Sequence, residues 1–361
     1  MSDYFKVVAS TGEYAVHIGR GVLDSKIRDL SQQVIICDQF FASAYHAQGL
    51  KVISVEAVET SKSLDQMSEV IIALRNLGAN RNTTALAIGG GVIQDIATFV
   101  ASVYMRGLKW NYLPTTLLGM VDSCIGGKSS INVGKYKNLI GNFYPPENIF
   151  IDLQFMDTLS AEQRIAGLCE AIKICFAHTG EAFERYITLN PNAASPPEIF
   201  QELIRLSLTT KRWFIEIDEH DHKERQLLNF GHTFGHAIEG AANFSIPHGI
   251  AVGMGMLAAI ECARLNGHFA SPPARVTLLA NNITTLLATI ADPALWTSQI
   301  AVDELMDHFN ADKKHTGRHY VVIVPDAAGR LIRLELEKNA TNRDLIFSAF
   351  RKVCRNTSVA I

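Results

Sequence analysis

The segment RQLLNFGHTFGHAIEGAANFSIPH (residues 225–248) places three histidines, an arginine and a glutamate in an otherwise apolar helical pattern. His232 and His236 are four residues apart and would share one face of a helix, and the same helix would bring Asn229 to the face of His232. His248 follows the turn-like NFSIP and begins the next helical pattern. Imidazole binds divalent metals and carries protons near neutral pH. For a lone pair of histidines, a buried core helix is the better explanation.

Charged residues elsewhere in the sequence favour a functional site. Glu170 and Lys173 interrupt the apolar helical pattern GLCEAIKICFA, where an unpaired charge would be costly to bury. Three neutral imidazoles and a carboxylate, brought together from separate helices, suit zinc or a similar divalent ion with open positions for substrate oxygens. With Arg225 added, a metal or catalytic site is favoured over a plain core helix.

A second cluster of polar residues lies in residues 104–146, which include YMRG, LPTTLLGMVDSCIGGKSSINVG and KYKNLIGNFYPP. Loops rich in glycine, serine and lysine favour a pocket for an anionic, phosphorylated substrate. Solvated surface lysines are the alternative, but the apolar flanks LLGMV and LIGNF indicate that the loop folds inward. The candidate side chains are Arg106, Lys128, Lys135, Lys137 and Asn138, to which the second half of the chain adds Lys211, Arg225, Lys313 and Lys314.

The segment AIGGGVIQD (residues 87–95) has a strand pattern that runs into three glycines and then a helical pattern. Glycines at such a turn allow backbone N–H groups to approach a phosphate, and the helix N-terminus adds partial positive charge. The spacing G-x-G-x-x-G is not met. A tight turn without a ligand therefore explains the segment equally well.

Elements that would position these residues follow from the hydrophobic periodicity. Short β-branched runs alternate with helical patterns in the first half, which predicts βαβ units and a mainly parallel sheet. The expected strands are 33–38, 51–58, 84–90, 110–114 and 148–153, with helices at 64–78 and 92–107. Long helical patterns follow at 161–180, 197–217, 227–243 and 249–267. We expect an α/β domain over residues 1–158 and a mostly helical domain over 159–361. The strand patterns HYVVIVP and RLIRLEL near the end predict either a hairpin that turns at DAAGR or strands that return to the first sheet.

Composition limits the class of protein. The 361 residues carry a formal net charge of −3, so no general basic surface attracts nucleic acid or an anionic membrane. No apolar run has the length of a signal peptide or of a membrane span, which predicts a soluble cytoplasmic protein. The six cysteines form no CxxC pair and are expected to be buried free thiols.

Several of these motifs, in this order and at these separations, resemble the 3-dehydroquinate synthase family and its relatives, the sugar phosphate cyclases. The motifs are GGGVIQD, YMRG, PTTLL, VDSCIGGKSSIN, KNLIGNFYPP, GLCEAIK and RQLLNFGHTFGHAIE, and they span the chain from about residue 34 to the segment ADKKHTG. The resemblance implies an N-terminal Rossmann-like NAD-binding domain, a C-terminal helical metal-binding domain, an active site in the cleft between them and, commonly, a homodimer.

The resemblance also implies roles for single residues. Zinc or cobalt would be bound by Glu170, His232 and His248. NAD would be contacted by Asp38, Glu59, Lys62, Gly89, Gly90, Gly91, Asp95, Thr115, Thr116, Asp122, Lys137 and Thr158. Substrate would be contacted by Arg106, Lys128, Asn138, Lys173, Lys211, Arg225, Asn229, His236 and one of Lys313 and Lys314. Among these, Lys128, Lys173, Arg225, Asn229 and His236 would act in catalysis.

The reaction implied by the resemblance starts from a seven-carbon keto acid phosphate, 3-deoxy-D-arabino-heptulosonate 7-phosphate. NAD⁺ removes a hydride from the carbon that bears a hydroxyl polarised by the metal, and the ketone formed acidifies the neighbouring C–H bond so that phosphate leaves. NADH then returns the hydride, the ring opens, and an intramolecular aldol step closes the carbocycle. NAD is therefore a catalytic cofactor that is not consumed.

Some positions depart from the pattern expected of this family and leave the substrate open. They are Gln94, Thr98, Asp221 and Ile250, together with the segment SSINVGKYKN. The alternatives are cyclases that act on an aminated heptulosonate phosphate, on glucose 6-phosphate (2-deoxy-scyllo-inosose synthase type) or on sedoheptulose 7-phosphate (2-epi-5-epi-valiolone synthase type). A metal-dependent NAD polyol dehydrogenase is a further alternative, although the many cationic candidates argue for a phosphorylated, acidic substrate.

Overall fold

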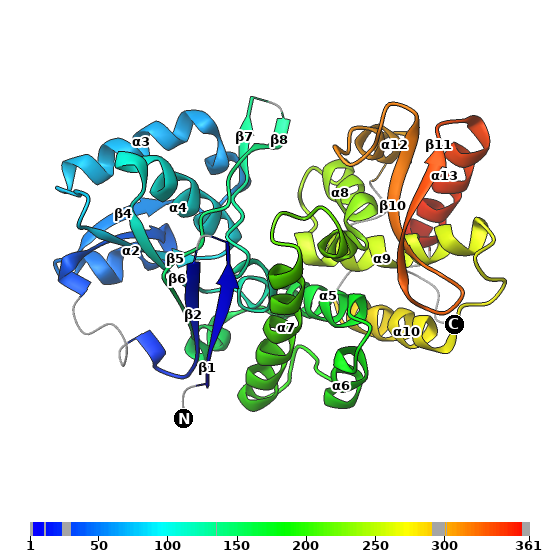
Figure 1. The fold of residues 1–361 in the computed structure, drawn as a ribbon, viewed down its shortest axis with the longest axis horizontal. Helices are drawn as coiled ribbons and strands as arrows, with labels where there is room; N and C mark the ends of the chain where they lie inside the picture. Colours follow the sequence, from blue (N-terminus) through cyan, green and yellow to red (C-terminus); the bar gives the residue numbers. More distant parts are fainter. Residues whose placement is uncertain are drawn as a thin grey trace. The chain divides into compact units, whose positions relative to one another are not determined.

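The computed structural model describes residues 3–10, 12–23, 30–134, 136–290, 300 and 302–355, so Lys135 lies outside the described residues. The chain divides into two compact units (Figure 1). The first is Met1–Leu159 with Pro196–Glu219, and the second is Ser160–Ser195 with His220–Ile361. The helix over residues 197–217 thus packs with the first unit, whereas the boundary expected from sequence assigns it to the second domain.

Within the described residues, the first unit contains a seven-stranded sheet with the order β1-β2-β9-β6-β5-β3-β4. Only β1 and β2 pair antiparallel, and the other neighbours are parallel. The strands are β1 (Asp3–Ala9), β2 (Gly12–Gly19), β3 (Gln33–Asp38), β4 (Lys51–Val55), β5 (Thr84–Gly89), β6 (Lys109–Pro114) and β9 (Asn148–Asp152). The five strands expected from the sequence are therefore confirmed, and β1 and β2 are additional.

Helices connect and cover these strands. They are α2 (Gln39–His46), α3 (Leu64–Asn76), α4 (Gly91–Val103) and α7 (Pro197–Ile217), with short 3-10 segments η1 (Leu30–Gln32), η2 (Glu59–Lys62), η3 (Tyr104–Arg106) and η5 (Leu153–Thr158). One π-helical turn, η4 (Gly119–Ser123), follows β6. A small hairpin of β7 (Ile131–Val133) and β8 (Tyr136–Ile140) stands beside α3 at one end of the unit (Figure 1). Strand β3 is buried from Val34 to Cys37, as expected when both faces of a parallel sheet are covered.

The second unit is mostly helical. It contains α5 (Ala161–Ala177), α6 (Ala182–Leu189), η6 (Glu224–Asn229), α8 (His232–Ala241), α9 (His248–Leu265), α10 (Ala274–Ala288), α12 (Val302–Asn310) and α13 (Ala340–Arg355). Strands β10 (His319–Pro325) and β11 (Leu331–Glu337) pair antiparallel as a separate two-stranded sheet, which confirms the hairpin alternative.

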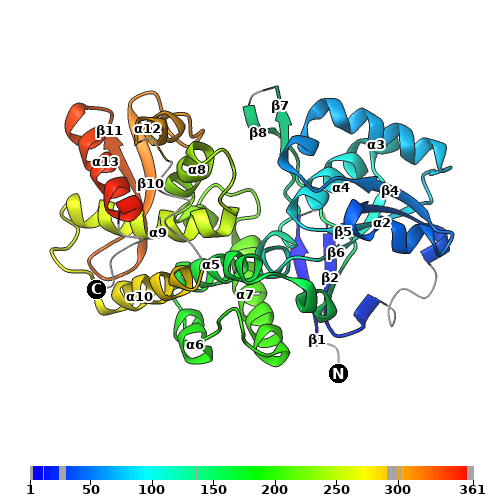
Figure 2. The ribbon, with the colours of Figure 1, turned by 180° about the vertical axis from the view of Figure 1, so that it is seen from behind.

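Helix α9 forms the core of this unit and packs against α5, α8, α10, α13 and β10 (Figure 2). Among the described helices, α9 alone has the length and mean hydropathy of a membrane span, but 78% of it is buried inside the protein. A core helix passes the same test. The six cysteines are free thiols, as expected; five of them are buried, whereas Cys354 is half-buried.

One expectation about the helices is wrong. The pattern over 227–243 predicts one continuous helix that carries both Asn229 and His232, but η6 ends at Asn229 and α8 begins at His232. Gly231 separates the two with a left-handed φ of +78°. A Cβ at Gly231 would lie 2.7 Å from the carbonyl oxygen of Val252, and one at Gly255 would lie 2.1 Å from the carbonyl oxygen of Gly231. The close approach of α9 therefore interrupts the helix that the periodicity of the sequence predicts.

Candidate functional site

The order of the strands locates a ligand-binding edge in the first unit. The chain leaves β3 toward β4 on one side, whereas β5 lies on the other side of β3. Ligands of open α/β sheets bind at the carboxyl ends of the strands where the order reverses in this way. Asp38 ends β3 and Gly89 ends β5 at this edge. Asp38 also caps α2, because its Oδ1 accepts a hydrogen bond of 3.1 Å from the backbone N–H of Phe40.

The three glycines form the turn from β5 into α4. Gly90 is the N-cap and Gly91 is the first residue of the helix. A Cβ at Gly90 would lie 3.0 Å from Thr116, whereas a Cβ at Gly91 would meet no atom within 4 Å. Thr115 is buried and donates its backbone N–H to the carbonyl of Gly89. An open cradle at a helix N-terminus is suited to the pyrophosphate of a dinucleotide.

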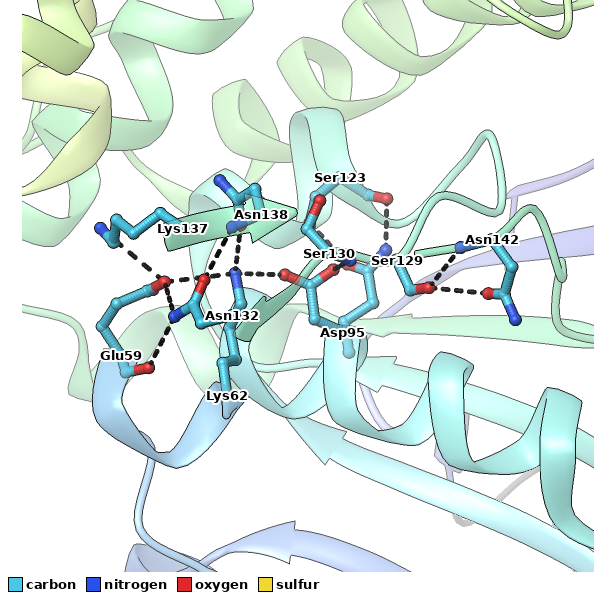
Figure 3. A network of polar contacts seen from close by, with 11 residues as sticks. Glu59, Lys62, Asp95, Ser123, Ser129, Ser130, Asn132, Lys137, Asn138 and Asn142 are labelled. Atoms are coloured by element: carbon cyan, nitrogen blue, oxygen red, sulfur yellow. Dashed lines mark hydrogen bonds and ion pairs between the residues drawn. The ribbon is translucent and has the colours of Figure 1, made fainter. Parts of the chain in front are cut away.

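Lys62 is the centre of a polar network next to this turn (Figure 3). Its ammonium lies 2.7 Å from Oδ2 of Asp95 and 3.5 Å from Oε1 of Glu59, and it donates to Oδ1 of Asn138 at 3.2 Å. Lys62 is only 6% exposed, so these pairs lie largely out of water. Burial raises the pKa of Asp95 to about 6, although Lys62 acts in the opposite direction. Residues expected to contact NAD are thus brought together with one expected to contact substrate.

Asn132 connects the two sides of this network (Figure 3). Its amide donates to Oε1 of Glu59 at 2.9 Å, and its Oδ1 accepts from the backbone N–H of Asn138 at 2.8 Å. Asn138 has a left-handed φ of +53°, which asparagine tolerates better than most residues. Lys137 lies 3.7 Å from Oε1 of Glu59. Asn132 is a site residue that the sequence analysis did not select.

Lys211 of α7 binds the π-helical turn η4. Its ammonium lies 2.5 Å from Oδ1 of Asp122 and donates to the backbone carbonyl of the same residue at 2.6 Å. Ser207, one turn earlier on α7, donates to the carbonyl of Val121 at 2.8 Å. Lys128 is half-buried, and its ammonium lies 5.8 Å from the centre of the Phe143 ring. π-Helical turns are frequent at functional sites.

Glu170 and Lys173 form a buried ion pair on α5 in the second unit, with exposed side-chain fractions of 1% and 2%. Oε1 of Glu170 also lies 3.8 Å from Nε2 of His232 and 3.4 Å from Nε2 of His248. Apart from these ionic contacts, neither Glu170 carboxylate oxygen accepts a hydrogen bond of good geometry from the described residues. A buried carboxylate with free lone pairs beside imidazole nitrogens is a suitable set of donors for a divalent ion. The residues present therefore fit the expected metal.

The three histidines lie together, because the ligand atoms of His232, His236 and His248 are all within 4.8 Å of one another. Burial lowers the pKa of His232 well below its usual value, and Lys173 adds to this effect. Burial also acts to lower the pKa of His248, but interactions with Glu170 and Glu239 outweigh it and raise that pKa to about 10.

Carboxylates orient two of these histidines. Nδ1 of His248 lies 3.1 Å from Oε2 of Glu239 and Nδ1 of His236 lies 3.7 Å from Oδ2 of Asp312. Lys314 binds both oxygens of Asp312, at 2.7 and 3.1 Å. Neither carboxylate is among the site residues expected from the sequence. Glu239 could have been found two helical turns after His232, whereas Asp312 lies in a distant segment.

Other expected site residues have different surroundings. Arg106 is exposed with a left-handed φ of +70°, directly after Met105 at +49°. Two such residues in succession are strained, and strain of this kind concentrates at functional sites. Thr158 and Lys313 are exposed. Arg225 and Asn229 lie on η6, where Arg225 is buried and the Asn229 amide donates to the carbonyl of Gln226.

Comparisons with known proteins agree with this description. Residues 52–166 match the family model of the 3-dehydroquinate synthase N-terminal domain, and residues 167–315 match that of the C-terminal domain. A 3-dehydroquinate synthase from Dictyoglomus thermophilum is 34% identical over 358 residues, which cover 95% of this chain and 97% of that protein.

Solved structures show the same fold. A 2-deoxy-scyllo-inosose synthase in complex with carbaglucose-6-phosphate, NAD⁺ and Co²⁺ has a TM-score of 0.84 at 23% identity, covering 97% of this chain and 99% of that one. A 2-epi-5-epi-valiolone synthase from Streptomyces hygroscopicus with NAD⁺ and Zn²⁺ has a TM-score of 0.77 at 24% identity, covering 95% and 97%. The chain thus has the dehydroquinate synthase-like fold expected from the sequence. With family models that cover most of its length, it belongs to the 3-dehydroquinate synthase family.

Proposed function

We propose that this protein is a carbon–oxygen lyase that converts 3-deoxy-D-arabino-heptulosonate 7-phosphate to 3-dehydroquinate and phosphate. The observation that carries the proposal is the buried Glu170 carboxylate, which lies beside His232 and His248 and against Lys173 in a member of this family. The choice of substrate is supported by the 34% identity to a 3-dehydroquinate synthase over nearly the full length of both chains. The solved synthases of other cyclitols are 23% and 24% identical.

We assign NAD and one divalent ion, zinc or cobalt, as cofactors. When bound, NAD supplies a reversible hydride acceptor, and the ion polarises a substrate hydroxyl as a Lewis acid. Glu170, His232 and His248 would hold the ion. The glycine turn of residues 89–91 would hold the pyrophosphate of NAD. The remaining contacts with NAD are assigned to Asp38, Glu59, Lys62, Asp95, Thr115, Thr116, Asp122, Lys137 and Thr158.

Cationic and amide side chains bind and orient the substrate in this proposal. Phosphate and carboxylate are both anionic at neutral pH, so they need several positive partners. We assign this task to Arg106, Lys128, Asn138, Lys173, Lys211, Arg225, Asn229 and Lys314. Lys314 is preferred over the exposed Lys313 because Asp312 holds it close to His236. His236 is the proposed proton carrier, oriented by Asp312. Holding a flexible substrate in one pose contributes much of the expected rate gain.

We further propose that the protein acts in the cytoplasm as a homodimer. The family resemblance supports the dimer, and sedimentation of the purified protein tests it. A monomer at the concentration of the activity assay would contradict this part of the proposal.

The proposed reaction is tested by the balance between phosphate and NADH. The purified protein is incubated with the heptulosonate phosphate, a catalytic amount of NAD⁺ and zinc or cobalt. We expect many equivalents of inorganic phosphate per NAD⁺ and no net NADH, because the hydride returns to the same substrate. Phosphate release only with glucose 6-phosphate, sedoheptulose 7-phosphate or an aminated heptulosonate phosphate would identify a different cyclase. Steady accumulation of NADH with an unphosphorylated polyol would identify a dehydrogenase.

A further inference from the structure

Gln94 and Asp95, adjacent residues near the N-terminus of α4, reach the two ends of the segment from Ser123 to Ser130. The Gln94 amide donates to the carbonyl of Ser123 at 2.6 Å, and the Ser123 hydroxyl donates to Oε1 of Gln94 at 2.6 Å. At the other end, Oδ1 of Asp95 accepts the backbone N–H of Ser130 at 3.1 Å. Figure 3 shows Ser123 and Ser130 on the segment that passes above Asp95. The N-terminal part of α4 thus holds the segment at two points.

The residues between Ser123 and Ser130 include the sequence GGK (residues 126–128). The backbone N–H of Gly126 donates to the Tyr14 hydroxyl at 2.9 Å, and the carbonyl of Gly127 accepts from the N–H of Tyr144 at 2.8 Å. A Cβ at Gly127 would lie 2.9 Å from the backbone nitrogen of Pro145. The backbone before Lys128 is therefore confined, and the position of its side chain depends on the contacts that hold this segment.

Gln94 is a buried polar residue, 4% exposed, whose amide oxygen and nitrogen both bind Ser123. A side chain engaged in this way acts on a ligand through the residue it holds. Glycine, which the family resemblance leads one to expect at position 94, could make neither hydrogen bond. Ser123 is also the last residue of the π-helical turn η4, and Lys211 binds that turn from α7 through Asp122.

We propose that Gln94 is a positioning residue that fixes the Ser123 end of this segment and thereby sets where Lys128 is presented to the anionic substrate. The inference rests on the proposed function, because that proposal assigns Lys128 to the substrate. Two hydrogen bonds from one buried amide remove backbone freedom before the substrate binds, and such preorganisation lowers the cost of binding.

Hydrogen–deuterium exchange of the unliganded protein tests the structural half of this inference without any assumption about function. Gln94→Met keeps the length of the side chain and removes both hydrogen bonds. We expect amides in residues 123–130 to exchange at least tenfold faster in this variant, with no change in α9. The matched control is Thr98→Val on the same helix, because Thr98 is fully buried and its hydroxyl has no hydrogen-bond partner among the described residues. Equal exchange in Gln94→Met and wild type would overturn the inference.

Substrate affinity tests the functional half. The heptulosonate phosphate is titrated calorimetrically with NADH in place of NAD⁺, so that oxidation cannot begin. We expect Gln94→Met to weaken substrate binding about tenfold and to change NADH binding less than twofold. Ser123→Ala should weaken it less, because the Gln94 amide can still donate to the backbone carbonyl of residue 123, and the double variant should be no weaker than Gln94→Met, which already removes both hydrogen bonds. Thr98→Val should bind as the wild type does.

Lys128→Met separates the two levels of failure. If this variant weakens substrate binding and Gln94→Met does not, Gln94 is not a positioning residue and the proposed function stands. If Lys128→Met binds the substrate as the wild type does, the assignment of Lys128 is wrong and the functional half of the inference is refuted with it. If the wild type does not bind this sugar phosphate, the proposed substrate is wrong, and the exchange result alone decides whether Gln94 fixes the segment.

Discussion

The contact between Glu239 and His248 leads to a quantitative prediction about metal affinity. In the proposed site His248 would hold the ion with Nε2, which lies 3.4 Å from Oε1 of Glu170, while Nδ1 lies 3.1 Å from Oε2 of Glu239. A carboxylate in this position fixes the tautomer and the orientation of the imidazole and increases its basicity as a ligand. Removal of such a partner typically weakens metal binding 10- to 100-fold.

The exposure of the two side chains narrows this range. Glu239 is 16% exposed and His248 is 36% exposed, so water can replace part of the lost hydrogen bond. We therefore expect Glu239→Ala to weaken zinc or cobalt binding about 10- to 30-fold, or roughly 1.4–2 kcal/mol. Glu239→Gln retains an oxygen that can accept from Nδ1–H but without charge, and a neutral hydrogen bond has about half the strength of a charge-assisted one. Glu239→Gln should therefore weaken metal binding by about three- to sixfold.

The assay is competition for the ion with a chromophoric chelator, in the absence of NAD and substrate. His232→Ala, which removes a proposed ligand, should lose far more affinity than either Glu239 variant. Glu304→Gln on α12 is the matched control, because it removes one negative charge at an exposed position of the same unit and should change affinity less than twofold. Binding by Glu239→Ala within twofold of the wild type would refute the orienting role of this carboxylate.

Two further predictions concern the stability of the protein without cofactors. Lys173→Met leaves the buried Glu170 without its ammonium partner, so with chelator present the free energy of unfolding in urea should fall by about 3 kcal/mol. This value is at the lower end of the range of about 3–5 kcal/mol for a broken buried ion pair, because His248 remains 3.4 Å from the Glu170 carboxylate. If the free energy of unfolding falls no further than in the variant Lys352→Met at an exposed position, the ion pair is not needed for stability. Asp95 has its pKa raised to about 6 by burial, so between about pH 4 and 6 the folded state retains a proton that the unfolded state releases, and the free energy of unfolding falls as the pH rises. Asp95→Asn cannot bind this proton, so its free energy of unfolding lacks the pH dependence that Asp95 contributes. The free energy of unfolding of the wild type minus that of the variant should therefore decline by up to about 3 kcal/mol between pH 4 and 6. If the two proteins show parallel pH profiles of stability, the Asp95 pKa is not raised.

The fold could be predicted best where burial is uniform. Strand β3 (Gln33–Asp38) is covered on both faces and reads as a continuous apolar run, so its ends are visible in the sequence. Strand β1 lies at the edge of the sheet, exposes Tyr4 and Val8 and includes Lys6, so the same pattern is absent. The break at Gly231 could not be predicted from helical period, because it depends on a helix that approaches from outside the segment.

The site could be predicted only in part for a similar reason. The types of Glu170, His232 and His248 indicate metal chemistry from their spacing and from the family motifs. The carboxylates that orient His248 and His236 are harder to find, because their pairing depends on which side chains face each other after folding. Glu239 is indicated only by its spacing after His232, and Asp312 lies in a distant segment. Acidic residues on helices and in loops are common and usually bind only water.

The glycines between α8 and α9 also determine the distance between two of the proposed ligands. His232 begins α8 and His248 begins α9, and the two helices touch where Gly231 and Gly255 leave no space for a methyl group. A Cβ at Gly255 would lie 2.1 Å from the carbonyl oxygen of Gly231, so alanine there requires the helices to separate by about 1.3 Å to reach an ordinary contact of ~3.4 Å. That displacement would move the His232 and His248 imidazoles apart by a large fraction of the length of a metal–nitrogen bond. These glycines therefore keep α8 and α9 close to each other, and an added methyl group in this contact would increase the spacing of the His232 and His248 imidazoles.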